Sequence, residues 1–201
     1  MGVIDSVHTT YVHSRRVGVL ATQLAGLLPA HARVLDIGCG DGLLSRLILN
    51  ARADLQIEGI DVLVRPSTHI PVKPFDGKMV PSAERSYDIV MLVDVLHHTM
   101  DPMVLLREAK RVARQSIVIK DHTKDGLLAG ATLRFMDYVG NARHGVSLPY
   151  NYWRERQWRG AFAELGLTIG VWQSSLHLYP RPADWVFGRR LHFIAKLEKS
   201  I

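Results

Sequence analysis

Cysteine is almost absent from the 201-residue sequence, in which Cys39 is the only one. A single cysteine excludes an internal disulfide framework and any cluster of cysteine ligands around a metal ion. Long apolar runs are also missing. The run from Ile89 to Val95 is interrupted by Asp94 and is far shorter than the roughly 18 residues that a membrane span requires. The sequence therefore predicts no transmembrane helix.

A signal-peptide pattern is missing as well, because residues 1–16 hold histidines and other polar residues where an apolar core would stand. A cytoplasmic location is therefore expected. Internal repeats and low-complexity tracts are absent. With 47% hydrophobic and 22% charged residues, the composition is that of an ordinary folded protein. The length corresponds to about one domain, so we expect a single domain over residues 1–201.

Positive charge is in excess, with a net charge of +6 that comes from residues 101–201. Such an excess attracts an anionic substrate, a membrane surface or nucleic acid, or it simply favours solubility. Lysine and arginine form no run longer than a pair, as at Arg15-Arg16 and Arg189-Arg190. A dedicated nucleic-acid surface is therefore not expected. The expected partner is a small molecule, and the oligomeric state stays open.

Apolar spacing predicts alternating strands and helices along the chain. Strands are expected at 33–37, 56–61, 70–74, 87–93, 116–120, 167–172 and 191–197, and helices at 12–28, 41–49, 103–113, 126–139 and 153–165. Continuous apolar strands linked by helices indicate an α/β fold with a mostly parallel sheet that is covered on both faces.

Three glycines follow the first predicted strand in the string Val34-Leu-Asp-Ile-Gly-Cys-Gly-Asp-Gly42. Glycines at such a turn let the backbone approach a ligand, and the N–H groups that begin the next helix face it. The spacing fits neither the dinucleotide fingerprint nor a P-loop. Asp36 precedes the glycines, and its charge disfavours a phosphate but favours an ammonium group. The turn therefore predicts a cofactor with an amino-acid moiety.

The same string resembles the first motif of the class I S-adenosylmethionine (SAM) dependent methyltransferases. The resemblance continues through Glu58-Gly-Ile-Asp61 and Phe75-Asp-Gly77, and residues 86–98 resemble the small-molecule branch that includes type 11-like and quinone methyltransferases. It implies a Rossmann-like sheet of seven strands, mostly parallel with the last strand antiparallel, and SAM as cofactor with no metal. The implied cofactor contacts are Asp36, Gly38, Cys39, Gly40, Asp61, Val62, Asp76, Gly77 and Asp94, among which Asp61 would meet the ribose and Asp76 the adenine amine.

Candidate catalytic residues follow the fourth and fifth predicted strands, because the ligand site of an open α/β sheet lies beyond the carboxyl ends of its strands. They are His97, His98, Asp121 and His122, next to Lys120. Methyl transfer from a sulfonium mainly requires alignment, and a histidine can also remove a proton from the acceptor. Alternatively, the paired histidines open a helix, with one packed beneath the cofactor and the other solvated.

The resemblance also implies a substrate-side lid inserted over residues 122–155. The stretch 134–153 mixes aromatic and polar residues, which is typical of a pocket for a small acceptor. The candidate substrate contacts are Asp137, Asn141, His144 and Tyr152. Alternatively, this stretch is a structural elbow with Tyr138 and Trp153 in the core.

The sequence thus predicts an enzyme that transfers a methyl group from SAM to oxygen, carbon or nitrogen of a small molecule. Two alternatives stay open. RNA or protein methylation is favoured only by the basic second half, and the chain lacks the Asn-Pro-Pro-Tyr type of signature found in many nucleic-acid N-methyltransferases. A catalytically silent SAM-binding protein is the other alternative, since fold does not fix function.

Overall fold

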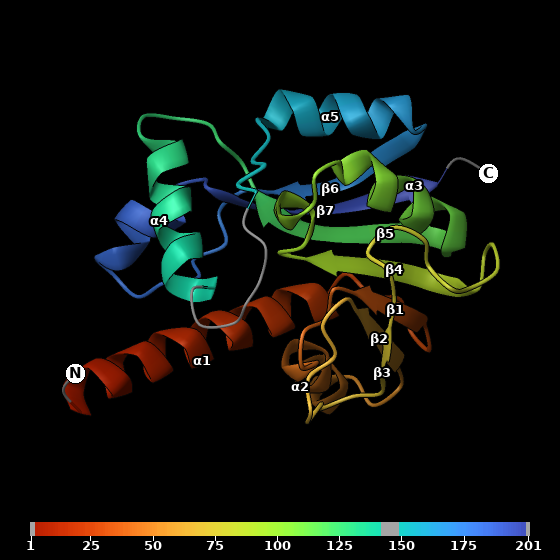
Figure 1. Ribbon diagram of the computed structural model, residues 1–201, viewed down its shortest axis with the longest axis horizontal. Helices are drawn as coiled ribbons and strands as arrows, with labels where there is room; N and C mark the ends of the chain where they lie inside the picture. The colour runs from red at the N-terminus through yellow and green to blue at the C-terminus, as the bar shows by residue number, and fades with distance from the viewer. Residues whose placement is uncertain (1–2, 142–148, 200–201) are drawn as a thin grey trace.

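The computed structural model describes residues 3–141 and 149–199 of the chain. One seven-stranded sheet runs through the molecule (Figure 1). Its strands are β1 (Arg33–Ile37), β2 (Gln56–Asp61), β3 (Val72–Pro74), β4 (Tyr87–Val93), β5 (Ala113–His122), β6 (Leu167–Gln173) and β7 (His192–Lys199). The α-helices are α1 (Val3–Ala25), α2 (Leu43–Ala51), α3 (Pro102–Val112), α4 (Ala129–Asn141) and α5 (Glu155–Glu164). Helices α3 and α5 cover one face of the sheet, and α1 and α2 cover the other.

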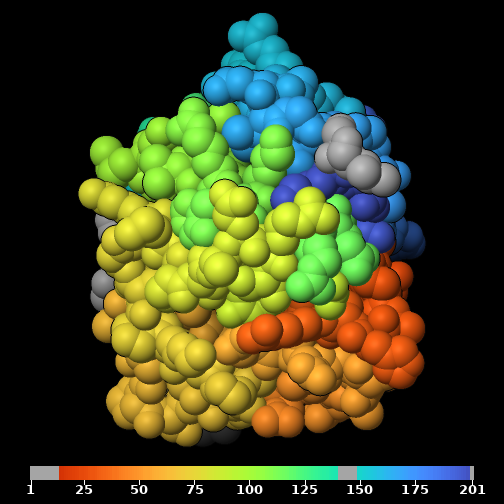
Figure 2. All heavy atoms as spheres, turned by 90° about the vertical axis from the view of Figure 1, so that its right-hand side faces the viewer, coloured from red at the N-terminus to blue at the C-terminus, as the bar shows by residue number. Residues whose placement is uncertain are grey.

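The strand order is β3-β2-β1-β4-β5-β7-β6, and β7 is antiparallel to both of its neighbours. The strands from β3 to β5 pair in parallel. Figure 2 views the molecule from the end where these parallel strands begin. The first half of the chain, red to yellow, fills the lower part of this view, and the second half, green to blue, fills the upper part. The predicted fold class and antiparallel last strand are confirmed.

The sheet separates two apolar cores, and β4 shows why its sequence is continuously hydrophobic. Val90 and Leu92 pack toward the core shared with α3 and α5, whereas Ile89 and Met91 pack toward the core shared with α1 and α2. All four side chains are fully buried. A strand covered on both faces has no solvent side, so alternation with polar residues is lost.

Strand β5 is longer than the predicted 116–120, because it begins at Ala113 and continues through two further polar residues to His122. Lys120, Asp121 and His122 are buried and pair with β7, where Asp121 lies opposite Phe193. The apolar pattern ends before these residues, although the backbone ladder continues. Helix α3 begins as expected, with Pro102 in its first turn and the Asp101 carboxylate accepting a hydrogen bond from the Met103 amide.

The connection from β5 to α5 carries α4, and the one from β6 to β7 carries a short π-helical turn at Asp184–Gly188 that the sequence pattern does not predict. The elbow alternative is half right: Trp153 packs against the core, but Tyr138 is exposed. No helix within residues 3–141 and 149–199 is long and apolar enough to cross a bilayer.

Candidate active site

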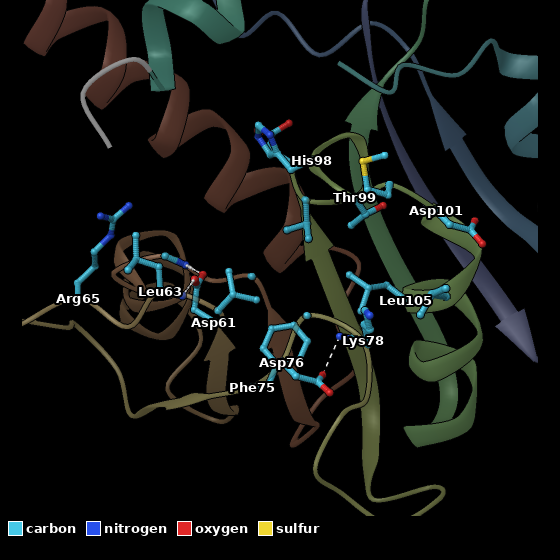
Figure 3. Close-up of a pocket in the computed structure, with 18 residues that line it drawn as sticks. Asp61, Leu63, Arg65, Phe75, Asp76, Lys78, His98, Thr99, Asp101 and Leu105 are labelled. Atoms are coloured by element: carbon cyan, nitrogen blue, oxygen red, sulfur yellow. Dashed lines mark hydrogen bonds between the residues drawn. The ribbon is translucent and has the colours of Figure 1, made fainter. Parts of the chain in front are cut away.

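A cavity of about 700 Å³ opens at the carboxyl ends of β1 to β4. These four strands are neighbours in the sheet, so the loops that follow them meet at one edge. The loops and the start of α3 contribute Gly38, Gly40, Asp61, Val62, Leu63, Arg65, Phe75, Asp76, Gly77, Lys78, Asp94, Val95, His98, Thr99, Met100, Asp101, Val104 and Leu105. In Figure 3, His98 and Thr99 lie on one side of the cavity, and Asp61, Phe75 and Asp76 on the other.

The glycine turn after β1 forms one wall of this cavity, through Gly38 and Gly40, and the backbone at both positions favours glycine. Gly38 has φ of 71° and a Cβ there would lie 2.5 Å from Cγ2 of Val95. Gly40 has φ of 60°, and a Cβ there would meet nothing within 4 Å. The backbone at Gly40 is therefore open to a ligand, as the sequence predicts.

Two acids line the cavity, namely Asp61 at the end of β2 and Asp76 in the loop after β3. The Asp61 carboxylate accepts hydrogen bonds from the amides of Gly40 and Leu63, each at 2.8 Å. Asp76 accepts the amides of Lys78 and Met79 through Oδ1 alone, which lowers the pKa of its carboxyl group. Its Oδ2 is therefore available to a ligand amine. Both carboxylates thus belong to the cavity lining, and their contacts with a cofactor stay predictions.

Asp36 and Cys39 do not lie where they were expected, because neither is among the described residues that line the cavity. The Asp36 carboxylate is buried and accepts a hydrogen bond of 2.6 Å from Ser45 of α2. Burial raises its pKa to about 7, despite the opposing effect of Ser45. Cys39 lies against Gly59 of β2, and burial raises the pKa of its thiol. The side chains of Asp36 and Cys39 thus hold the glycine turn against α2 and β2.

Asp94 lines the cavity at the end of β4, but two cations already hold its carboxylate. Arg16 of α1 and Lys120 of β5 both donate to it. Burial alone would raise the pKa of Asp94, yet these cations outweigh burial and hold it well below the ordinary range. Its backbone has φ of 57°, fixed by a hydrogen bond from its amide to the Lys120 carbonyl. Such a left-handed conformation is uncommon in a non-glycine residue, and aspartate adopts it more readily than most.

His97 lies behind the cavity wall, between two carboxylates. Its Nδ1 is 2.7 Å from Oδ1 of Asp121, and its Nε2 is 3.5 Å from Oδ2 of Asp137. Burial alone would lower the pKa of His97, but the two carboxylates raise it to about 10. The ring is therefore an imidazolium near neutral pH and cannot accept a proton there. His97 fits the packed role that the sequence left open for one of the pair.

His98 does line the cavity, and its ring centroid is 4.0 Å from that of His97. Burial and the adjacent positive charge of His97 lower the pKa of His98, while Asp137, Asp121 and Asp94 act in the opposite direction. The ring is therefore neutral near pH 7. Of the four candidate catalytic residues, only His98 is among the described residues that line the cavity.

Asp121 and His122 belong to the buried network around His97. Asp121 also accepts the amides of Leu96 and His122, so it holds the short 3-10 helix Leu96–His98 against β5. Burial, with Lys120 and His97 nearby, lowers the pKa of His122 to about 4. Neither residue is among those described as lining the cavity. Their hydrogen bonds and ion pairs hold His97 and its neighbours in place behind the cavity.

The candidate substrate contacts are only partly brought to the site. The Tyr152 hydroxyl donates to Asp137, and its ring stacks on His97 with centroids 5.6 Å apart. Both residues thus support His97 from α4 and the loop before α5. Asn141 ends α4 and its side chain lies outside the described part of the chain, as does the whole of His144.

Two groups of side chains have the composition of a metal site, namely Asp94, His97 and His122, and His97, His98 and Asp137. Their possible ligand atoms lie within 4.8 Å of one another. The carboxylates, however, are engaged by Arg16, Lys120 and Tyr152, and Asp121 holds the shared His97. We therefore assign both groups to the hydrogen-bond network.

Arg16 is the main residue near the site that the sequence does not predict. It lies in the middle of α1 and meets Asp94 across 78 positions of sequence. Leu63, Arg65 and Met100 were missed as well, although Leu63 and Arg65 come two and four residues after the predicted strand 56–61, and Met100 comes seven residues after the strand 87–93. That position is a usable signal for the loop residues, whereas nothing in the sequence marks Arg16.

Comparison with known proteins gives relatives that match parts of the chain. The 27-O-demethylrifamycin SV methyltransferase of Amycolatopsis mediterranei (strain S699) is 30% identical over 110 residues, which cover 47% of this chain and 40% of that protein. A ubiquinone biosynthesis O-methyltransferase of Proteus mirabilis (strain HI4320) is 29% identical over 123 residues, which cover 55% of this chain and 45% of that protein. The chain spans less than half the length of these curated relatives.

Solved structures show the same fold over nearly the whole chain. The PH0226 protein of Pyrococcus horikoshii OT3 superposes with a TM-score of 0.69 at 14% identity, covering 94% of this chain and 91% of that one. A SAM-dependent methyltransferase of Thermotoga maritima, described as a possible histamine N-methyltransferase, superposes with a TM-score of 0.67 at 17% identity. The match covers 98% of this chain and 96% of that one. The family described as "Methyltransferase domain" matches residues 11–170. With the glycine turn, the two acids and the sheet order in place, the chain belongs to this family of class I SAM-dependent methyltransferases.

Proposed function

We propose that the protein binds SAM in the cavity and transfers its methyl group to a hydroxyl of a small, mainly apolar acceptor. The observation that carries this proposal is the meeting of the glycine turn, Asp61, Asp76 and His98 in one cavity. The first three suit a nucleoside with an amino-acid group, and His98 suits removal of a proton.

The residues present fit SAM. The Asp61 carboxylate has lone pairs beyond those used by Gly40 and Leu63, so it can accept two ribose hydroxyls. Oδ2 of Asp76 can accept the adenine amine, and Val62 and Phe75 offer apolar contact to the ring. When bound, SAM supplies an electrophilic methyl group on a sulfonium that is already a good leaving group.

The chain itself then has three tasks, which are to align the acceptor, exclude water and take up a proton. Val95, Met100 and Leu105 give the acceptor side an apolar lining. His98, neutral near pH 7, removes the hydroxyl proton through a ring nitrogen as the oxygen attacks. His97 keeps a positive charge behind it, which disfavours protonation of His98 before the reaction.

The choice of a hydroxyl rests on the relatives, because the two described above are named as O-methyltransferases or as acting on a 27-O-demethyl compound. The apolar lining favours an acceptor with a large hydrophobic part. Lys78 and Arg65 at the rim are isolated cations, which do not form a track for a nucleic-acid backbone.

Calorimetry with SAM and with its demethylated product tests the cofactor assignment, and separate titrations with NAD and ATP serve as comparisons. We expect binding at about micromolar strength for the first two and none for the others. Binding of NAD or ATP without SAM would overturn the assignment. A screen of phenols and apolar alcohols with labelled SAM then tests turnover. Tight SAM binding without turnover on any hydroxyl, amine or carbon acceptor would instead favour a silent SAM-binding protein.

A further inference from the structure

Seven large apolar side chains are exposed in the two connections that lie at the carboxyl ends of the strands. Each is between 50% and 83% exposed. They are Leu127, Leu128, Phe135, Tyr138 and Val139, in and just before α4, and Trp185 and Val186 in the π-helical turn. We call this set the α4 face. Single exposed apolar residues are ordinary, but a group of this size on two adjacent segments marks an interaction surface.

The two segments form one surface, because they pack against each other. The rings of Phe135 and Phe187 are stacked with centroids 6.4 Å apart, and Arg189 donates to the Thr132 hydroxyl. Figure 1 shows α4 beside the blue turn at one end of the molecule. Helical spacing separates the two sides of α4: Leu133 and Asp137 are buried, whereas Phe135 and Tyr138 are exposed.

Exposed charges around the α4 face are basic. They are Lys124, Arg134, Arg181, Arg189 and Arg190. The acids of the same two segments are turned inward, since Asp125 accepts the Glu155 amide, Asp184 accepts the Tyr179 amide and Asp137 is buried. The basic excess that composition placed in the second half of the chain is thus gathered, in part, around an apolar patch.

We propose that the α4 face binds the surface of an anionic membrane, and that the methyl acceptor reaches the cavity from that membrane. Aromatic and leucine side chains enter the boundary between headgroups and acyl chains, and arginines bind anionic headgroups. A second copy of the chain fits less well, because a twofold contact would bring the like charges of Arg134, Arg189 and Arg190 together.

The α4 face lies on the outside of the helix whose inner side supports the site. Asp137 on that inner side is 3.5 Å from His97, and the adjacent His98 lines the cavity. A bilayer against the outer side would therefore hold an amphiphilic acceptor close to the cavity. This part of the inference rests on the proposed function and narrows its acceptor to a lipid-soluble compound with a hydroxyl group.

Vesicle flotation tests the membrane contact on the full chain. We expect binding to vesicles of phosphatidylglycerol mixed equally with phosphatidylcholine, and much weaker binding to phosphatidylcholine alone. The fluorescence of Trp185 gives a second readout, because it is the exposed tryptophan among the four. Its emission should shift to the blue and be quenched by brominated acyl chains. Absence of binding to either vesicle would overturn the proposal.

Matched variants distinguish membrane binding through the α4 face from nonspecific adsorption to vesicles. Phe135→Ser with Trp185→Ser, and separately Arg189→Glu with Arg190→Glu, should each weaken vesicle binding about tenfold or more. Met79→Ser and Arg107→Glu change exposed residues of the same types away from the α4 face and should leave binding unchanged. Equal loss in all variants, or none in the first two, would contradict the proposal. A wild-type dimer in sedimentation that dissociates in the Phe135 and Trp185 double variant would also contradict the proposal.

The cofactor assignment is measured separately in the same proteins. SAM affinity by calorimetry should be equal in the wild type and in both α4-face variants. If vesicle binding behaves as expected but SAM does not bind, the proposed function fails while the surface stands. If SAM binds and vesicles do not, only the membrane proposal fails.

Discussion

His97 and His98 are neighbours in the chain with ring centroids 4.0 Å apart, yet they have opposite electrostatic environments. Asp121 and Asp137 enclose His97 and raise its pKa to about 10, whereas burial and the charge on His97 lower the pKa of His98. The arrangement keeps a charged ring behind a neutral one. Pairs of titratable groups whose pKa values are driven apart are typical of acid and base assignments in enzymes.

Replacing His98 by Gln should reduce turnover by roughly 10²-fold to 10⁴-fold, which is the contribution of a general base. SAM affinity should stay close to that of the wild type. Because the neutral ring is the active form, the wild-type rate should rise with pH through a pKa below the ordinary histidine value, and the variant should lose this limb. His69→Gln, at an exposed histidine outside the cavity lining, is the control. A pH-independent wild-type rate would leave alignment alone as the mechanism.

Replacing His97 by Gln should mainly reduce stability, since it leaves Asp121 and Asp137 buried without their cation. Breaking a buried ion pair costs about 3 to 5 kcal/mol. The folded pKa of His97 is raised, so its stabilising effect is complete below the unfolded value near 6.5 and is lost as pH rises toward about 10. Urea unfolding at pH 6 and above pH 9 should therefore show a larger difference from wild type at the lower pH. An equal difference at both would contradict a charged His97.

Asp61→Ala should weaken SAM binding by about 1.5 to 3 kcal/mol, or roughly 10-fold to 150-fold, through loss of charge-assisted hydrogen bonds. Glu58→Ala is the matched control, because it removes an acid from the same strand whose partners are Arg33 and Lys73. Calorimetry gives the affinities and thermal unfolding verifies the fold. Unchanged affinity in the Asp61 variant would remove this residue from the cofactor site.

Gly38→Ala should destabilise the chain and weaken SAM binding together. The new Cβ would lie 2.5 Å from Val95 at a φ of 71°, and left-handed backbone alone costs about 1 to 2 kcal/mol for a residue with a side chain. In Gly160→Ala the new Cβ meets nothing within 4 Å, and alanine in a helix should stabilise by about 0.5 to 1 kcal/mol. Thermal unfolding of both variants compares the two effects, and a stable Gly38 variant with normal SAM affinity would contradict the geometry of the turn.

The parts of the fold that the sequence predicted well are those in which burial and spacing agree. The bounds of β1, β2 and β4 follow directly from short apolar runs that end in a glycine or an acid. The last two residues of β5 were missed because Asp121 and His122, which follow the buried Lys120, are polar and yet buried. Their burial is stabilised by one another and by Asp94, which no local pattern reveals.

The site could be predicted where a loop follows a strand, as for Asp61, Asp76 and His98. Side-chain direction could not be predicted. Asp36 and Cys39 stand inside the glycine motif but turn toward Ser45 and Gly59, away from the cavity. Likewise, the sequence offers two adjacent histidines as bases, and only the carboxylates brought in from β5 and α4 distinguish them.

The buried network that holds Asp94 draws on the far ends of the chain, from Arg16 in α1 to His192 at the start of β7, whose ring is 3.3 Å from the Lys120 ammonium. Contacts of such long sequence separation form late, because the chain must first lose the entropy of closing large loops. During refolding, the central strands should therefore gain protection from hydrogen exchange before the cofactor can bind. In a newly made chain, likewise, we expect the network around Asp94 to be complete only after β7 has joined the sheet.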